Sequence, residues 1–566
     1  MKNWRRILCF SLMITILSQF PLTESTQIPP YVKINIPDGT IVYEGDIINC
    51  TITGNPVEIY WIIDNQTPHY LFYNNNPVIY NPEPTPLNAT YVNLTVYARN
   101  NHGSSSDTVR IILKRIYFGD IHFHSTISDG YHSIDTLYSN TIKDNYLDFA
   151  CLTDHAEIIN SLDFTPPQPL WMFTRSLIQF MLYKLGLRDE WSIIKQKAIE
   201  YYKPGRFTTL LGFEYSPGPW YPGGYPWSPN GHEDICHINF YYKDVYPDAR
   251  KYSGWDCHTF DEVLGVMGKE REKGHLVVCF PHHPIMRIGR CFGAYTVNWS
   301  FLHDNIKNTT ARDNLLRGAE VYSKWGTSIG RYSGIPIHWS YDPKNCVDSP
   351  EYWVEKALWE WSENTTKNRL FAIIASSDNH AVDRAGSASL QSRVSGGHPN
   401  PSGLIAVYSI HNTRPEIWDA LNNCSMYGVQ ALKIRANIRF NNEMVIGRWI
   451  NTTKQLHIRV TAYATFPGLD SSGRSMCPHG YPDDQLDNII ENIWVIKKDR
   501  TRGAPWCKIV AHTNPNSKLG VLEFNDWDVH PNDFYYIVIQ QNGAKLGDRD
   551  SKYMAFLGPV FIDSTS

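Results

Sequence analysis

Hydrophobic and polar positions follow two different periodic patterns along this chain of 566 residues. Near the N-terminus, segments such as IVYEGDIINCTITG and VEIYWIID alternate apolar with polar residues, which predicts strands with one buried face. Between about residues 115 and 425, short apolar runs typical of strands alternate with longer stretches typical of helices. This second pattern predicts βα units and a central α/β region.

Six segments of the central region predict helices: residues 133–143, 170–185, 191–202, 260–273, 352–362 and 415–423. The segment 170–185 is apolar enough to suggest membrane contact, but we favour a helix buried against the central domain. From Val429 onward the strand pattern returns, in LKIRANIRF, LHIRVTAYATF, IIENIWVIKK, KIVAHT, FYYIVIQQ and AFLGPVFI. We expect these strands to form a C-terminal β-sandwich.

The first residues predict export. Lys2, Arg5 and Arg6 precede an apolar run over residues 7–20, which is typical of a signal peptide. A retained membrane anchor is the alternative, although the run is shorter than the roughly 20 residues that a span needs. The pattern therefore predicts four parts: a signal peptide (1–26), an N-terminal β-sandwich (27–114), the central domain (115–425) and the C-terminal sandwich (426–566). The mature protein is expected to be secreted or held at the cell surface.

Composition agrees with export and disfavours nucleic acid as a partner. The formal net charge is −4 and no basic cluster stands out, so the electrostatic footprint of a nucleic-acid binder is missing. Asn-x-Ser/Thr sequons occur at Asn49, Asn65, Asn88, Asn93, Asn298, Asn308, Asn364, Asn423 and Asn451, which predicts a glycoprotein.

Ten cysteines follow the predicted signal peptide, and Cys477 with Cys507 is the disulfide we favour. Cys151 and Cys279 lie in apolar runs and are expected to be buried.

The N-terminal sandwich resembles an immunoglobulin-type domain. Cys50 and Trp61 are spaced like the B-strand cysteine and C-strand tryptophan of that fold, and NLTVYARNNHGSSSDTVRI resembles its F–G hairpin. Val96 stands where the second cysteine of the fold would be, so Cys50 is expected to be a free core thiol. A spacer is the role we favour for this part, over ligand binding.

In the central region, apolar runs carry metal-binding residue types at or near their ends. The segments are GDIHFHSTISDG, LDFACLTDHAE, TLLGFEY, DICHINFYY, HLVVCFPHHP, GAEVYS and IIASSDNH. Active-site groups collect at the carboxyl ends of parallel strands, so such a series predicts one shared site. His122 and His124 are two apart on a strand and project to the same face. Imidazole and carboxylate without clear cysteine ligands suit Zn²⁺, Mn²⁺ or Fe²⁺.

This ordered series resembles the polymerase and histidinol phosphatase (PHP) family of metal-dependent phosphoesterases, over roughly residues 116–410. The segments SDNHAVDRAG, PHHP and WDALNNCSMYGVQ further resemble an uncharacterised secreted branch of PHP-like proteins. The resemblance implies a distorted, seven-stranded, TIM-like βα barrel that holds two or three divalent transition metal ions. The fold class expected for the whole chain is therefore α/β, with this barrel flanked by two β-sandwiches.

The resemblance also implies a set of ligands. The first ion would be held by His122, His124 and Asp378, with Glu214 bridging it to the second, and the third by Asp129, His155 and His380. His237 would bind the second ion with either His282 or His283. The family pattern, a histidine before proline, favours His283, but the doubled histidine leaves the choice open because successive strand residues face opposite ways.

Other groups near these segments are candidates for supporting roles. Asp120 and Asp154 are expected to orient the histidines, and Glu320 is a further supporting carboxylate. His282, where it is not a ligand, is the candidate acid for the leaving oxygen. Arg287 and Arg384 follow ligand segments and are candidates to bind phosphate oxygens, although a structural role for each is equally open.

The loop YSPGPWYPGGYPWSPNGHEDIC joins Glu214 to His237, so its aromatic residues are the expected determinants of substrate choice.

The chemistry expected from such a cluster is hydrolysis. A carboxylate that spans two ions lets them share a hydroxide whose pKa falls toward about 7, and this hydroxide is the nucleophile. We therefore expect an exported metal-dependent hydrolase, most specifically a phosphoesterase acting on a small phosphorylated substrate. Two alternatives remain: an amidohydrolase-like enzyme for amides or esters, and a surface protein that binds without catalysis.

Overall fold

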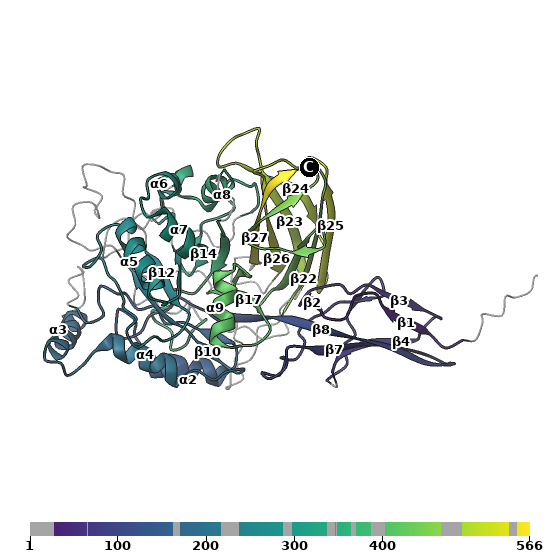
Figure 1. Cartoon of the computed structure of the whole chain (residues 1–566), viewed down its shortest axis with the longest axis horizontal. Helices are drawn as coiled ribbons and strands as arrows, with labels where there is room; N and C mark the ends of the chain where they lie inside the picture. Colours follow the sequence, from purple (N-terminus) through teal and green to yellow (C-terminus); the bar gives the residue numbers. More distant parts are fainter. Residues whose placement is uncertain are drawn as a thin grey trace, which may run out of the picture. The chain divides into compact units, whose positions relative to one another are not determined.

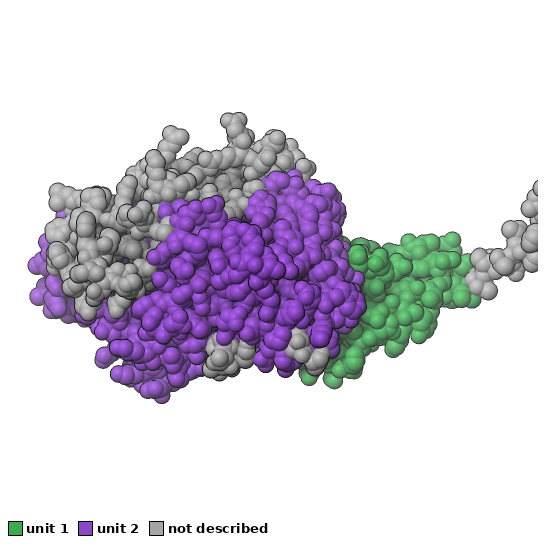
Figure 2. Space-filling model, turned by 90° about the horizontal axis from the view of Figure 1, so that it is seen from above, with its two compact units in different colours: residues 1–41, 47–79, 91–112 green, residues 42–46, 80–90, 113–566 purple. Residues whose placement is uncertain are grey.

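The computed structural model describes residues 28–64, 66–161, 170–216, 237–282, 284–286, 297–336, 346, 348–363, 369–386, 402–465, 489–542 and 552–565. The predicted signal peptide lies outside these residues. The chain divides into two compact units, which Figure 2 colours separately: residues 1–41, 47–79 and 91–112, and residues 42–46, 80–90 and 113–566. Within the described part of the chain, no helix combines the length and the apolar character needed to cross a membrane.

The first unit consists of short antiparallel strands. β1 (Tyr31–Ile34) pairs with β3 (Cys50–Thr53), β5 (Phe72–Tyr73) with β6 (Asn76–Pro77), and β4 (Glu58–Ile63) with β7 (Val92–Asn100). β7 turns directly into β8 (Gly103–Asp120), which confirms the predicted hairpin. Trp61 is fully buried opposite Val96, and Cys50 is a half-buried free thiol. The immunoglobulin-type resemblance itself stays a prediction.

The central strands of the second unit form a mixed, not a wholly parallel, arrangement. β8 pairs in parallel with β9 (Phe149–Ala150), β9 with β10 (Thr208–Thr209), and β14 (Gly318–Ser323) with β16 (Ala372–Ala375). β11 (Leu211–Tyr215), β12 (Ile238–Tyr242) and β13 (Val277–Pro281) instead form an antiparallel sheet. All of the predicted strands are present, but the expectation that each presents its ligand at a carboxyl end of a parallel strand is wrong for β12.

β12 runs opposite to its neighbours, and this explains how His237 reaches the site. His237 immediately precedes β12, at its amino end, whereas Glu214 and His282 lie at the carboxyl ends of β11 and β13. The register pairs Tyr215 with Ile238, and Ile238 with Pro281. The amino end of the reversed strand therefore lies at the same edge as the carboxyl ends on either side.

The six predicted helices are confirmed as α2 (Ile134–Asp144), α3 (Leu170–Lys184), α4 (Glu190–Glu200), α5 (Phe260–Glu272), α8 (Val354–Ser362) and α9 (Arg414–Asn422). The first turn of α5 is closed by a capping box between Thr259 and Glu262. Three short helices escaped prediction: α6 (Trp299–Asp304), α7 (Thr309–Leu315) and the 3₁₀ turn η1 (Pro350–Tyr352).

The prediction that residues 170–185 form a buried helix is wrong for the described side chains of α3. Ile178 and Met181 are more than half exposed, and Leu177 and Leu185 also face solvent. In Figure 1, α3 lies at the periphery of the second unit.

The C-terminal strands continue the sheet that contains β10, β9 and β8. From β8 it passes through β17 (Gly403–Ser409), β18 (Met426–Gln430), β27 (Lys552–Thr565), β26 (Phe534–Asn542) and β23 (Ile490–Lys498) to β24 (Cys507–Thr513), and β21 (Arg448–Thr452) joins β27. A second sheet contains β20 (Glu443–Met444), β19 (Arg435–Phe440), β22 (Leu456–Tyr463) and β25 (Leu519–Asp526). Rings such as Phe440 and Tyr535 meet between the two sheets, and Figure 1 shows these strands grouped together.

Cysteine burial follows the sequence in part. Cys151 and Cys279 are fully buried, as predicted. Cys507 is a buried free thiol, against the predicted disulfide, and Cys477 lies outside the described residues.

Candidate metal centre

The structure brings the predicted ligand segments together around one buried carboxylate, Glu214. Its Oε1 contacts His237 Nδ1 at 2.6 Å and also contacts His282 Nε2. Its Oε2 lies within 3.5 Å of ring nitrogens of three further histidines, His122, His124 and His155. The two oxygens of one side chain thus face two sets of imidazoles, as a carboxylate that bridges two ions would. The groups at Glu214 that could hold an ion are His122 with His124, and His155 with His237.

Asp378 joins His122, His124 and Glu214 on the Oε2 side of the carboxylate. His122 Nε2 and His124 Nε2 are 3.4 Å apart, and Asp378 Oδ1 lies 3.4 Å from the first and 3.1 Å from the second. Glu214 Oε2 is 3.5 and 3.3 Å from the same two nitrogens. Metal–ligand bonds of about 2.0–2.1 Å place the atoms of a tetrahedral site about 3.3 Å apart. These distances suit ligands of one transition ion, and His122, His124 and Glu214 form a buried group that could hold it.

A second group surrounds Asp129. Its Oδ2 lies 3.1 Å from His380 Nε2 and 3.8 Å from His155 Nε2, and its Oδ1 is 3.7 Å from His124 Nδ1. The turn that carries Asp129 depends on Gly130, because a Cβ at this position would lie 2.4 Å from the carbonyl oxygen of His124. These four side chains, like the group of His155, Glu214 and His237, could hold a metal ion.

His122 has a partner that the sequence indicated only weakly. Glu320, within β14, places Oε2 3.1 Å from Nδ1 of His122, on the side of the ring away from Glu214. Glu320 is buried, and burial raises its pKa to about 7. A carboxylate that accepts from the outer nitrogen of a ligating histidine fixes the tautomer and the orientation of the ring.

Two further residues after β14 were not found from the sequence. The indole nitrogen of Trp325 donates to Oδ2 of Asp378, and Lys324 Nζ lies 2.7 Å from Nδ1 of His380. Burial lowers the pKa of Lys324, while Asp378 and Asp129 oppose this effect. The segment YSKWGT carries no pattern that marks it as part of a site, because both residues follow the strand in a turn.

Asp120 and Asp154 support the site through the backbone and serines, and contact no histidine ring in the described hydrogen bonds. Asp120 accepts from the hydroxyl of Ser377 and from the backbone N–H of His122. Asp154 accepts from the hydroxyl and the backbone N–H of Ser125, at 2.6 and 2.7 Å. They fix the segments that carry the ligands. One such ligand, Asp378, has φ of 52°, a left-handed conformation that only a well-determined neighbourhood maintains.

The electrostatics of the cluster depend on opposed charges. Burial alone would raise the pKa of Glu214, but His155, His282 and His237 lower it well below the usual range. Burial and the neighbouring His380 lower the pKa of His124 to about 3. Burial alone would also lower the pKa of His122 and of His155, but nearby carboxylates instead raise it well above the usual range. Ionised carboxylates and neutral imidazoles are the forms that bind metal, so an ion would displace protons from these two rings.

The remaining candidates have different outcomes. Arg384 donates to Asp144, at the end of α2, and to Asp383 at 3.0 Å, so the described contacts pair its guanidinium with these carboxylates and not with the cluster. His282 is in the cluster. His283, Arg287 and the aromatic loop before residue 237 lie outside the described residues, apart from the first residues of that loop.

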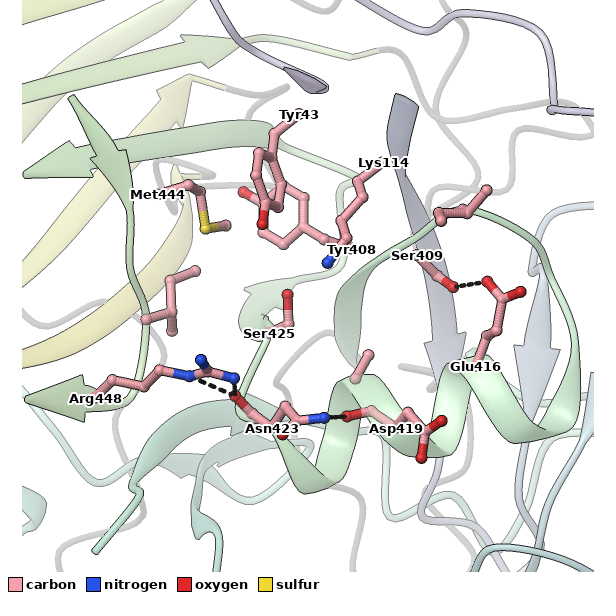
Figure 3. A pocket seen from close by; sticks show the side chains of 13 residues that line it. Tyr43, Lys114, Tyr408, Ser409, Glu416, Asp419, Asn423, Ser425, Met444 and Arg448 are labelled. Carbon is pink, nitrogen blue, oxygen red and sulfur yellow. Dashed lines mark hydrogen bonds between the residues drawn. The ribbon is translucent and has the colours of Figure 1, made fainter. Parts of the chain in front are cut away.

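A separate pocket of about 380 Å³ is lined by residues such as Tyr43, Lys114 and Tyr408. Figure 3 shows that several polar groups around it are already paired with one another, as Ser409 is with Glu416 at 3.0 Å. None of the residues lining it belongs to the metal-binding groups. The histidine and carboxylate cluster is therefore the stronger candidate.

The site defines a class of centre: buried imidazoles and carboxylates that could hold more than one divalent ion.

A model of the family described as "Protein of unknown function (DUF3604)" matches residues 173–328. Among solved structures, a two-domain protein from Bacteroides vulgatus, described as containing a predicted PHP-like metal-dependent phosphoesterase, is 13% identical with a TM-score of 0.31, over 78% of this chain and 95% of that chain. A β-glucuronidase from Parabacteroides merdae is 8% identical with a TM-score of 0.17, over 95% of this chain and 64% of that chain. No curated protein matches. Likenesses at these TM-scores define no fold, so the functional argument depends on the site itself.

Proposed function

We propose that this protein is an exported metal-dependent hydrolase that cleaves phosphate esters. The observation that carries the proposal is the position of Glu214, whose two oxygens face two separate groups of histidines. Structural zinc sites are typically closed by four ligands around a single ion. A bridged pair of ions is the arrangement used for hydrolysis of phosphate esters and related bonds.

The residues would be divided among the ions as follows. His122, His124, Asp378 and Glu214 Oε2 would hold the first ion, and Glu214 Oε1 with His237 and His282 the second. Asp129, His155 and His380 would hold a third. When bound, divalent ions supply a nucleophile from water at neutral pH and neutralise charge on the substrate. The position of His282 at Glu214 supports a ligand role over that of the leaving-group acid.

The choice of phosphate over other esters is supported by Lys324. Its ammonium group lies 2.7 Å from His380, beside the Asp129 group, and is half-buried. A cation held there would bind a non-reacting oxygen of a phosphate group, the role first considered for Arg287 and Arg384.

A distorted barrel of the PHP type around the cluster is supported by the order of the strand pairings. Isolated parallel bridges between His155 and Glu214 and between Phe123 and Asn379 link further segments of the site.

A substrate panel tests the reaction. The protein loaded with Mn²⁺ or Zn²⁺ should hydrolyse phosphate mono- or diesters, and Glu214→Gln should abolish turnover. Glu270→Gln is the matched control, because Glu270 is also a buried carboxylate paired with a histidine, His275, but lies outside the cluster. Lys324→Gln should raise KM for phosphate esters more than for carboxylic esters. Turnover of amides or carboxylic esters alone would replace the proposed substrate class, and no turnover of any panel would favour a binding protein.

A further inference from the structure

Helix α3 turns an apolar stripe toward solvent. Leu177, Ile178, Met181 and Leu185 are spaced so that they share one face at helical periodicity. Their exposed fractions are 37%, 53%, 55% and 67%. Leu185 directly follows the last residue of α3, and Leu187, two residues further on, is 72% exposed. A contiguous exposed apolar patch of this kind typically marks a site that binds another protein or a membrane.

The opposite face of the same helix is polar and faces the protein. The guanidinium of Arg175 donates to the carbonyl of Ser128, and the amide of Gln179 donates to that of Thr126 at 3.4 Å. Ser176 is buried. An ordinary surface helix buries its apolar side and exposes its polar side, since burial of apolar area is what stabilises it. In the described part of α3 this order is reversed, so its outer face requires an apolar partner.

Charge indicates what that partner is. Residues 170–188 contain three cations, Arg175, Lys184 and Arg188, and no Asp or Glu. Arg175 faces the protein and Arg188 Nε lies 3.6 Å from Oε1 of Glu190, whereas Lys184 is exposed beside the apolar face. Lys184 lies 5.1 Å from the ring of Phe180, so its stem runs along an aromatic side chain while its ammonium stays accessible. Apolar residues flanked by cations are typical of helices that lie in the interface of an anionic membrane. A second copy packed on this face would bring like charges together, which disfavours a dimer.

We propose that α3 docks on an anionic phospholipid surface, with Leu177, Ile178, Met181 and Leu185 inserted among the lipid chains. The helix has 15 residues and is therefore about 22 Å long, shorter than the roughly 30 Å of a bilayer core. It lies along the surface and does not span it. Its polar face binds the carbonyls of Thr126 and Ser128, just before Asp129, so docking places α3 between the membrane and the turn that carries this candidate ligand. The proposal does not depend on which bond the cluster cleaves.

Hydrogen–deuterium exchange of the full chain tests the contact locally. Vesicles of phosphatidylserine with phosphatidylcholine should protect peptides from residues 174–187 and leave those of α4 unchanged, whereas vesicles of phosphatidylcholine alone should protect α3 less. In flotation, Ile178→Ser with Met181→Ser should weaken binding by about tenfold or more, because each side chain loses its apolar burial. Ile199→Ser is the control, since Ile199 is 58% exposed on α4 and should leave binding unchanged.

Four results would overturn the proposal. An Ile178→Cys thiol that a soluble maleimide does not label in the absence of vesicles would show that another part of the chain covers the helix. Flotation without protection of α3, or without an effect of the double variant, would assign membrane binding to a different segment. Loss of an oligomer in the double variant, with no vesicle binding by the parent, would assign the face to a second copy. Where the double variant does not fold, Lys184→Glu with Arg188→Glu tests the charge, and binding unchanged by this reversal also contradicts the proposal.

Discussion

Replacing Glu320 tests whether a buried carboxylate outside the cluster tunes the first metal site. Glu320 is 2% exposed and its two oxygens lie 3.1 and 3.4 Å from Nδ1 of His122. His122 Nε2, on the other side of the ring, lies within 3.5 Å of donor atoms of His124, Asp378 and Glu214. Substitution at position 320 therefore leaves every proposed ligand in place and changes only how one of them is held.

The expected magnitude follows from this geometry. Loss of the outer partner of a ligating histidine typically weakens metal binding by about 10–100-fold, or roughly 1.4–2.8 kcal/mol. Glu320→Gln keeps an oxygen that can accept from Nδ1–H but removes the charge, so it should fall near the lower value. Glu320→Ala leaves the buried nitrogen without this acceptor and opens a cavity, so it should reach the upper value.

Competition with a chromophoric chelator measures Zn²⁺ affinity directly, and circular dichroism confirms that each variant is folded. Glu270→Gln is the matched control, because Glu270 Oε2 lies 2.8 Å from Nδ1 of His275 in a buried pair outside the cluster. The reasoning fails where Glu320→Ala binds metal as tightly as the parent protein. It also fails where Glu270→Gln weakens binding to the same extent, since the effect would then be a general loss of packing.

Three other substitutions address single features. Trp325→Phe removes the donor to Asp378 and should weaken the first metal site by about 0.5–1.5 kcal/mol in the same chelator assay, and unchanged affinity would contradict this. Burial raises the pKa of the Glu355 carboxyl to about 7, above its ordinary value of 4.5. The native state therefore holds this proton more tightly than the unfolded chain does, and stability is lost as pH rises between these two values. Glu355→Gln should remove this loss, roughly 2–4 kcal/mol between pH 5 and 8 in urea unfolding, and parallel pH profiles for the two proteins would refute it. Gly318→Ala should destabilise the fold by about 3 kcal/mol or more, because the new Cβ would lie 1.9 Å from the backbone oxygen of Ala372. Gly503→Ala is the control: a Cβ there meets no atom within 4 Å, so the substitution should cost only about 1 kcal/mol. Equal decreases in Tm for the two variants would contradict this prediction.

The sequence predicted which segments approach the cluster but not how they pair. Apolar runs ending in histidine or carboxylate indicated each strand of the site, because a buried strand leaves a clear hydrophobic signal. Strand direction leaves no such local signal. For that reason the reversal of β12, which puts His237 at an amino end, became visible only from the register.

Two other features were beyond local patterns for different reasons. Lys324 and Trp325 act on the cluster from a turn, where neither periodicity nor a ligand motif distinguishes them from surface residues. The apolar composition of α3 was read as burial, since hydrophobicity reports a preference for leaving water and not the partner that satisfies it. Continuation of one sheet from β17 into β18 and β27 likewise depends on long-range pairing.

The central claim is that Glu214 bridges ions held by two groups of histidines. Anomalous diffraction from crystals grown with Zn²⁺ or Mn²⁺ tests it most directly. The account predicts peaks on both sides of the Glu214 carboxylate, one among His122, His124 and Asp378 and another beside His237 and His282, and loss of at least one of these peaks in Glu214→Gln. Metal-loaded crystals with no peak within bonding distance of Glu214, or with the same peaks in the variant, would contradict it.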